Sequence, residues 1–186
     1  MKNIDVIGIV ALAFFLEKTE NYKKALEFFE KQKIQTIESK NIDKKYYNTT
    51  APVEERIKDL EEKFLNSKID MIVSLDGGCT VIEMIDKVDY DMINKNKKIF
   101  TGFSDLTHLQ IAMYTKSKLP SLYGMDIING FGNNNEFTQK NINSFFNIIN
   151  KILHILSCKK FSNMLSYNFR KVCCNNRRRV NYSISK

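Results

Sequence analysis

Strands and helices alternate along the first 125 residues, and this alternation constrains the fold more than any other feature of the chain. The continuous apolar run Val6–Ala13 is typical of a strand that is buried on both faces. Four later segments have the same character: Ile34–Ile37, Met71–Leu75, Ile99–Gly102 and Leu119–Tyr123. Parallel strands need crossover helices, so we expect an α/β fold with an open, mostly parallel sheet flanked by helices on both faces, a flavodoxin-like or Rossmann-like three-layer sandwich.

The segments between these strands have helical periodicity. Residues 21–32 predict a short helix, and residues 52–66 predict a second whose N-terminus Thr50 would cap. A third helix is expected through Val81, Ile82 and Ile85, and a fourth is expected to carry Leu109. A last helix begins near Thr138 and has a long apolar stripe over residues 142–156, which needs either the sheet or another chain as a partner.

The formal charge of +8 invites a nucleic-acid interpretation, but the charge is confined to one end of the chain. The first 157 residues hold 21 Lys and Arg against all 21 Asp and Glu, whereas the last 29 hold eight Lys and Arg and no acid. The run Arg177–Arg179 is too short, with too few aromatic residues around it, to favour nucleic acid or a membrane surface as a partner. We therefore expect neither nucleic-acid nor membrane binding.

Cysteine content and hydropathy favour a cytoplasmic location. The four cysteines have neither metal-ligand spacing nor the pattern of a secreted disulfide scaffold. The longest apolar run, Val6–Leu16, is too short to span a membrane. It also makes a poor signal peptide, because Asp5 precedes it and charged residues stand where a cleavage site is required.

The turn at Ser104 is the clearest candidate for chemistry. Gly102 ends a predicted strand and permits a tight turn, and a serine two residues later would present its hydroxyl above the edge of the sheet. The alternative is that Ser104, Asp105 or Thr107 only caps the following helix. A second turn, Asp76-Gly77-Gly78, also follows a strand, and ligands of open parallel sheets bind at such strand ends.

The chain resembles the serine LD-carboxypeptidase family, which includes muramoyltetrapeptide carboxypeptidases and microcin C immunity peptidases. The resemblance covers residues 69–149, together with a helix that precedes them, and depends on the order and spacing of several stretches rather than on any single one. The matching stretches are Val53–Leu60, Ile72–Leu75 with Gly77-Gly78, Val88–Ile93, Lys98–Thr107, Ile111–Lys116, Leu122–Gly124 and Glu136–Thr138.

The resemblance implies the roles of individual residues. Ser104 would be the nucleophile, the backbone N–H groups of Asp105 and Gly78 would form the oxyanion hole, and Gly77 would let the backbone approach the substrate. The Asp105 side chain is expected to brace the turn. The family hydrolyses an L,D-amide bond in cytoplasmic peptidoglycan fragments or, in the immunity branch, an aminoacyl-nucleotide antibiotic, without metal or cofactor.

The family takes its catalytic Glu and His from a second, C-terminal domain that has no counterpart here. We predict that residues 1–149 form the nucleophile domain and that residues 150–186 form a basic, cysteine-containing tail that is non-native or disordered. His108 is expected on a helix surface and His154 lies outside the matching region, so neither is assigned as the base.

The resulting hypothesis is a serine peptidase acting on an L,D-peptide or a related aminoacyl conjugate, with impaired activity because the base is missing. A homodimer is compatible with it. The alternative is a non-catalytic half-domain that docks a partner through the helix at 142–156.

Overall fold

The computed structural model describes residues 4–17, 19–133 and 135–157. Residues 3–146 form one compact unit, and the remaining residues belong to a second unit. Of the predicted basic tail, residues 158–186 lie outside the described residues. Within the described part of the chain, no helix is long and apolar enough to cross a membrane.

The sheet is parallel throughout and has five strands, which confirms the predicted fold class. In spatial order the strands run β2-β1-β3-β4-β5. Their bounds are β1 Val6–Val10, β2 Gln35–Glu38, β3 Met71–Ser74, β4 Ile99–Gly102 and β5 Leu122–Tyr123. The chain moves from β1 to one side of the sheet and then returns to the other, so the order reverses between β1 and β3. Such a switch point opens a crevice at the carboxyl ends of the strands.

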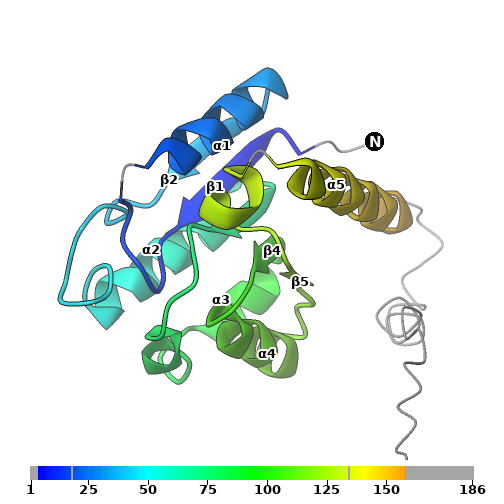
Figure 1. The fold of residues 1–186 in the computed structure, drawn as a ribbon. Coiled ribbons are helices and arrows are strands. Elements are labelled where there is room, and N and C mark those ends of the chain that lie inside the picture. The colour runs from blue at the N-terminus through cyan, green and yellow to red at the C-terminus, as the bar shows by residue number, and fades with distance from the viewer. Residues whose placement is uncertain (1–3, 18, 134, 158–186) are drawn as a thin grey trace, which may run out of the picture. The chain divides into compact units, whose positions relative to one another are not determined.

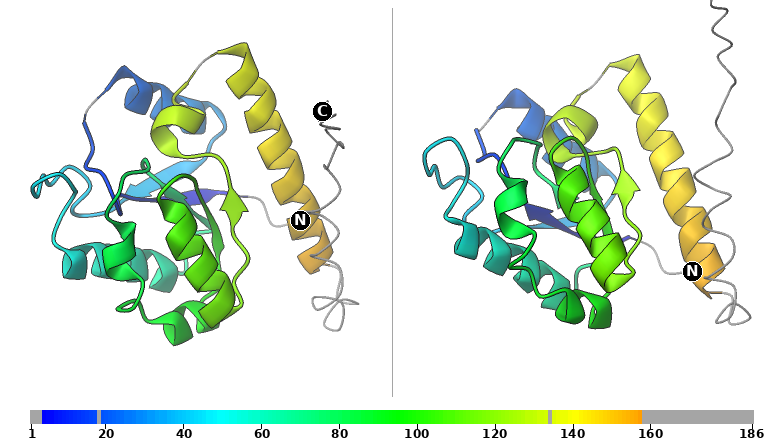
Figure 2. Two further views of the ribbon diagram at one scale, coloured as in Figure 1. Left: turned by 60° about the horizontal axis from the view of Figure 1, so that its bottom comes forward. Right: turned by 90° about the horizontal axis from the view of Figure 1, so that it is seen from below.

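Helices cover both faces of the sheet (Figures 1 and 2). α1 and the short π-helical segment η2 lie on one face, and α2, α3 and α4 lie on the other. The bounds are α1 Glu20–Lys31, α2 Val53–Leu65, the 3₁₀ turn η1 Val81–Met84, α3 Tyr90–Lys95, α4 Leu106–Ser117, η2 Ile127–Phe131 and α5 Glu136–Ser157. Only the part of α5 up to Phe146 belongs to the unit that contains the sheet.

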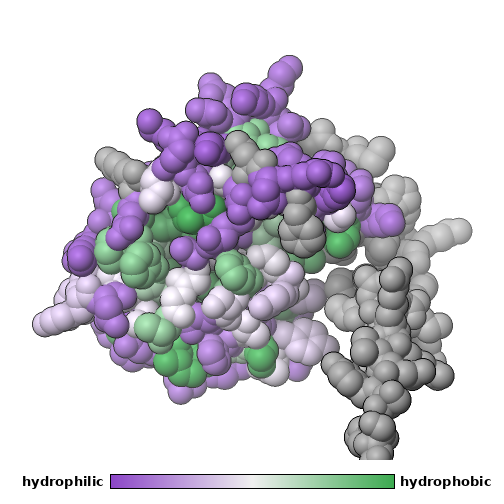
Figure 3. Space-filling model, in the orientation of Figure 1, coloured by the Kyte–Doolittle hydropathy of each residue, from purple (hydrophilic) through white to green (hydrophobic). Residues whose placement is uncertain are grey.

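The core consists of one apolar layer on each face of the sheet. Beneath α2, α3 and α4, side chains such as Leu60, Ile72 and Phe100 are fully buried. On the other face, Phe131 of η2 packs against Phe29 of α1 and Phe145 of α5, with ring centroids 4.8 and 5.6 Å apart. On the molecular face drawn in Figure 3, the apolar residues form small patches among hydrophilic ones.

Three local expectations are wrong. Thr50 does not cap α2; its hydroxyl donates to the Asn41 carbonyl at 2.8 Å, and Pro52 occupies the cap position. The helix predicted through Val81 is a single 3₁₀ turn, and a separate helix begins after Asp89, whose side chain accepts from the Met92 N–H. β1 stops at Val10, although residues 11–13 stay buried and continue the apolar run as a loop.

Gly132, at the contact between α1 and η2, should tolerate no side chain. A Cβ built there would lie 2.3 Å from the Asn21 carbonyl oxygen and 2.8 Å from that of Ile128, and neither backbone atom can move cheaply. We expect Gly132→Ala to lower the free energy of unfolding by about 3 kcal/mol, the upper range for overpacking. Urea denaturation would measure the loss, and Asn133→Ala provides a neighbouring control. A loss equal to that of the control would contradict the packing described here.

Candidate active site

Ser104 lies in a strained turn between β4 and α4. Its φ is +59°, in the left-handed region that costs a residue with a side chain about 1–2 kcal/mol. The Ser104 carbonyl accepts from the Thr107 N–H at 3.0 Å and from the Thr107 hydroxyl at 2.5 Å, which holds the turn in place. The Ser104 residue itself is exposed. A strained, exposed serine between a strand and a helix has the geometry of a nucleophile elbow.

Gly102 makes this turn possible. A Cβ at this position would lie 2.6 Å from the Ser74 hydroxyl oxygen and 3.2 Å from the Leu106 side chain. The Gly102 carbonyl accepts from the side-chain amide of Gln110, which also binds the Leu122 carbonyl at 2.8 Å. Gln110 therefore links the carboxyl ends of β4 and β5 by hydrogen bonds, next to the turn that carries Ser104.

The double-glycine turn after β3 meets the nucleophile turn at close range. A Cβ on Gly77 would lie 3.0 Å from the Ser104 Cβ and 3.2 Å from its Oγ. A Cβ on Gly78 would lie 2.6 Å from the Cβ of Ala13, in the loop after β1, and Gly78 also has a positive φ of 159°. The structure thus places Gly77 directly against Ser104, with Gly78 next to it against the loop after β1, and the roles assigned to these residues stay predictions.

Two backbone N–H groups of this crevice are available to a ligand. The Gly77 N–H is taken, because it donates to the Asp76 carboxylate at 2.7 Å. Among the described residues, neither the N–H of Gly78 nor that of Asp105 donates a hydrogen bond. The Asp105 N–H stands at the N-terminus of α4, where the helix dipole favours negative charge. These are the two donors to which the family resemblance assigns the oxyanion hole, and backbone N–H groups of this kind stabilise such an anion.

The Asp105 side chain braces the site. It is 6% exposed, and its Oδ2 accepts from the Val81 N–H at 2.9 Å. Its Oδ1 lies 3.3 Å from Nδ1 of His108, whose imidazole is 55% exposed. The carboxylate therefore joins the start of α4 to the turn that follows the two glycines. The side chain of the other histidine, His154, lies outside the described residues.

Sequence reasoning missed a polar cluster on one side of the double-glycine turn. Asp126 is fully buried and accepts from the N–H groups of Asn129 and Gly130, both at 2.7 Å. The Asn129 side-chain amide donates to Asp126 and also to Asp76, at 3.1 and 2.9 Å. Asp76 in turn holds the Gly77 N–H. An aspartate three residues before an Asn-Gly pair is a turn signal that could have revealed this cluster.

Asp126 should make stability depend on pH. Burial raises the pKa of its carboxyl to about 6, against hydrogen bonds that lower it. Between about pH 4 and 6 the folded chain holds this proton and the unfolded chain does not, so stability falls as pH rises. A pKa raised by about two units, at about 1.4 kcal/mol per unit, corresponds to a loss of unfolding free energy on the order of 3 kcal/mol.

Asp126→Asn tests this linkage, since an amide stays neutral and keeps an acceptor for both backbone donors. Urea denaturation of both proteins from pH 4.5 to 7 would give the stability difference. The wild-type protein should lose stability relative to the variant as pH rises. Parallel profiles would show that Asp126 does not titrate in this range.

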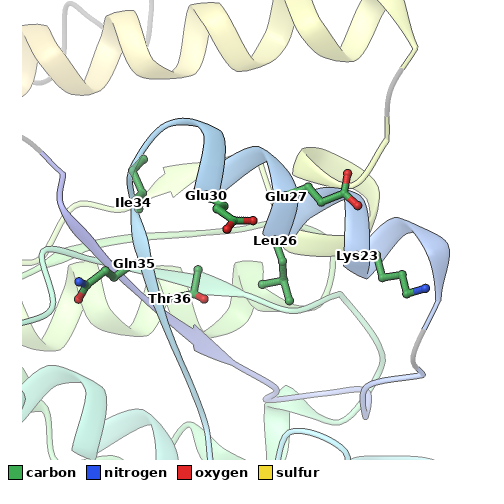
Figure 4. A pocket seen from close by; sticks show the side chains of 7 residues that line it. All are labelled: Lys23, Leu26, Glu27, Glu30, Ile34, Gln35 and Thr36. Carbon is green, nitrogen blue, oxygen red and sulfur yellow. The ribbon is translucent and has the colours of Figure 1, made fainter.

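A groove at the opposite end of the sheet is separate from this site. Its volume is about 650 Å³, and it opens between α1 and β2 (Figure 4). Its lining comprises Lys23, Leu26, Glu27, Glu30, Ile34, Gln35 and Thr36. The strand residues in this list are the first of β2, so the groove lies at the amino end of the strands, away from Ser104. Among the described residues, no three His, Cys, Asp or Glu side chains gather as a metal would require.

Comparison with known proteins places the chain in a family. Residues 7–124 match the LD-carboxypeptidase N-terminal domain, so the chain belongs to that family. The microcin C7 self-immunity protein MccF of Escherichia coli is 28% identical over 128 residues, covering 69% of this chain and 37% of its own length. A Bacillus subtilis protein named "probable murein peptide carboxypeptidase" is 27% identical over 120 residues, covering 64% of this chain and 37% of its own length.

Solved structures agree with this assignment. MccF in complex with aspartyl sulfamoyl adenosine superposes with a TM-score of 0.75 at 27% identity, over 80% of this chain and 45% of that one. A muramoyltetrapeptide carboxypeptidase from Oxalobacter formigenes has a TM-score of 0.66 at 22% identity, over 75% of this chain and 47% of that one, and supports the fold alone. The chain spans less than half the length of these proteins.

Proposed function

We propose that this chain carries the nucleophile and the oxyanion hole of a serine peptidase that cleaves an L,D-amide bond. The observation that carries the proposal is the close approach of the exposed, strained Ser104 to the double-glycine turn, where the N–H groups of Gly78 and Asp105 donate no hydrogen bond among the described residues. Family membership supports a peptidase over a docking subunit, because the matching domain is that of LD-carboxypeptidases and the relatives carry carboxypeptidase or self-immunity names.

In this mechanism the Ser104 Oγ attacks the scissile carbonyl carbon and its proton passes to a general base. The carbonyl oxygen becomes an oxyanion held by the N–H groups of Gly78 and Asp105, and the amine then leaves with a proton to give an acyl-enzyme. Water releases the acid in a second, equivalent step. The two N–H donors would bind a negative charge that develops only in the transition state. Interactions that are stronger in the transition state than in the ground state are the ones that accelerate a reaction.

The general base is the part that the described residues do not supply. The His108 ring is bound to Asp105 through Nδ1 and lies largely in solvent, on a helix that leads away from Ser104. We infer that the described residues need a general base from elsewhere, as the family resemblance implies, and that turnover without that base is slow. Loss of a triad member costs about 10⁴–10⁶ in kcat in serine proteases.

The test is hydrolysis of an L,D-linked peptidoglycan tetrapeptide by the purified chain, with the released C-terminal residue detected by mass spectrometry. The L,L isomer serves as the stereochemical control, and an aminoacyl-nucleotide conjugate is the second substrate arm. We expect slow release from an L,D or conjugate substrate that is absent with Ser104→Ala. Equal release by wild type and variant would refute the proposal.

A further inference from the structure

The guanidinium of Arg56 is buried behind the double-glycine turn, at a place that stability alone does not explain. Arg56, on α2, is 1% exposed, and its Nε has no hydrogen-bond partner among the described residues. A buried charge with an unsatisfied nitrogen is expensive, and an apolar side chain of similar size is often as stable or more so. The free-energy cost of burying this guanidinium indicates that Arg56 has a role other than stabilising the fold.

The contacts of this guanidinium join the two segments that shape the oxyanion hole. Nη1 donates to the Leu12 carbonyl at 2.8 Å and to the Thr80 carbonyl and hydroxyl at 3.2 and 3.1 Å. Nη2 is bound by the Glu83 carboxylate. Leu12 belongs to the loop after β1, whereas Thr80 and Glu83 follow the double-glycine turn after β3.

A second layer of contacts completes the attachment. The Thr49 hydroxyl lies 2.9 Å from that of Thr80 and donates to the Ala13 carbonyl at 2.6 Å. Both threonines are buried. Ala13 is also the residue against which Gly78 packs too closely to admit a Cβ. The Thr80 hydroxyl also donates to the Ala13 carbonyl, at 3.3 Å. Arg56 thus contacts Thr80, Thr80 contacts Ala13, and Ala13 borders Gly78, whose N–H donates no hydrogen bond among the described residues.

We propose that Arg56 is a positioning residue that fixes the orientation of the Gly78 N–H toward the carbonyl oxygen of the substrate. It acts through Leu12 and Thr80 and touches neither substrate nor Ser104. The inference builds on the proposed function, since it gives the oxyanion hole its support. The sign of the charge matters, because one cation satisfies two carbonyls and one carboxylate at once.

Arg56→Ala and Arg56→Lys test this role, with Phe64→Leu as a matched control. Phe64 is fully buried on the same helix, so its truncation weakens α2 without touching the turn. The reporter is the Val81 N–H, whose hydrogen bond to Asp105 ties the turn to α4. We expect its amide hydrogen exchange to accelerate about tenfold in Arg56→Ala relative to the core amides of β3, and less in Arg56→Lys.

The second readout is the affinity for a peptide boronic acid in which boron replaces the scissile carbonyl carbon. Its tetrahedral adduct with Ser104 is an equilibrium species that ¹¹B NMR detects, so the experiment does not depend on a general base or on turnover. When wild type and variant are compared at the same fraction of folded protein, Arg56→Ala should weaken the affinity for the boronic acid about tenfold to a hundredfold. This is the expected effect of misplacing one hydrogen-bond donor.

Rescue by a small cation separates positioning from general destabilisation. A hollow of about 300 Å³, lined in part by Arg56, Thr80 and Glu83, leads from solvent to the guanidinium. Guanidinium ion at low millimolar concentration should restore adduct formation in Arg56→Ala, whereas urea, planar and uncharged, should not.

The proposal would be overturned if Arg56→Ala changed the Val81 exchange rate and the boronate affinity no more than Phe64→Leu does. If the wild-type chain forms no adduct, the proposed function fails, and the exchange measurement alone decides whether Arg56 holds the turn.

Discussion

Replacement of Ser104 by alanine should abolish the tetrahedral adduct with a peptide boronic acid, while the fold stays intact. The adduct requires an oxygen nucleophile at the position where Ser104 Oγ lies, 3.2 Å from the point that a Cβ on Gly77 would occupy. Alanine removes that oxygen and changes little else, since the residue is exposed and the Thr107 contacts go to its backbone carbonyl. The ¹¹B signal should remain trigonal at every concentration of the variant.

Ser67→Ala is the matched control for this experiment, because Ser67 is an exposed serine in the loop between α2 and β3. It should form the adduct as the wild-type chain does. A tetrahedral signal that survives Ser104→Ala would mean that another hydroxyl holds the boron, and the assignment of the nucleophile would then be wrong.

Gly78→Val should weaken the same adduct more than a hundredfold, the cost of losing one oxyanion donor. The first side-chain atom would lie 2.6 Å from the Ala13 Cβ and 3.3 Å from the Ala13 backbone carbonyl carbon. The φ of 159° adds strain for a branched residue. Because Arg56 and Thr80 hold the far side of the turn, the Gly78 peptide is expected to rotate away from Ser104.

Gly124→Ala separates this effect from backbone strain alone. Gly124 has a similar φ of 156°, but a Cβ there would meet no atom within 4 Å. The control should therefore share the strain and keep the adduct. Equal adduct affinity of Gly78→Val and wild type would show that the Gly78 N–H is not a donor to the oxyanion.

The regular elements near the site could be predicted because their signals are local. β4 covers exactly the predicted Ile99–Gly102, since an apolar segment ending in glycine marks both the strand and its turn. β5 is shorter than predicted: only Leu122 and Tyr123 pair with β4, at the edge of the sheet. Apolar periodicity shows which residues are buried but cannot show where strand pairing stops.

Arg56 illustrates the opposite case. It stands four residues before the buried Leu60 and three after Val53, so helical spacing places it on the inner face of α2. That signal was available, but it could not name the partners. Leu12 and Thr80 lie 44 and 24 residues away along the chain. The loops that carry Leu12 and Thr80 meet at the guanidinium because β1 and β3, the strands that precede them, are neighbours in the sheet.

The sequence by itself determined the α/β class, the family and the turn that presents Ser104, because strand ends, glycines and helix starts are set by short-range sterics and hydrophobic spacing. The tertiary structure alone decided which N–H groups are free, that Asp105 braces Val81 and that Asp126 and Arg56 support the glycine turn from two sides. Those facts depend on contacts between loops at neighbouring strand ends, and no local pattern encodes which loops become neighbours.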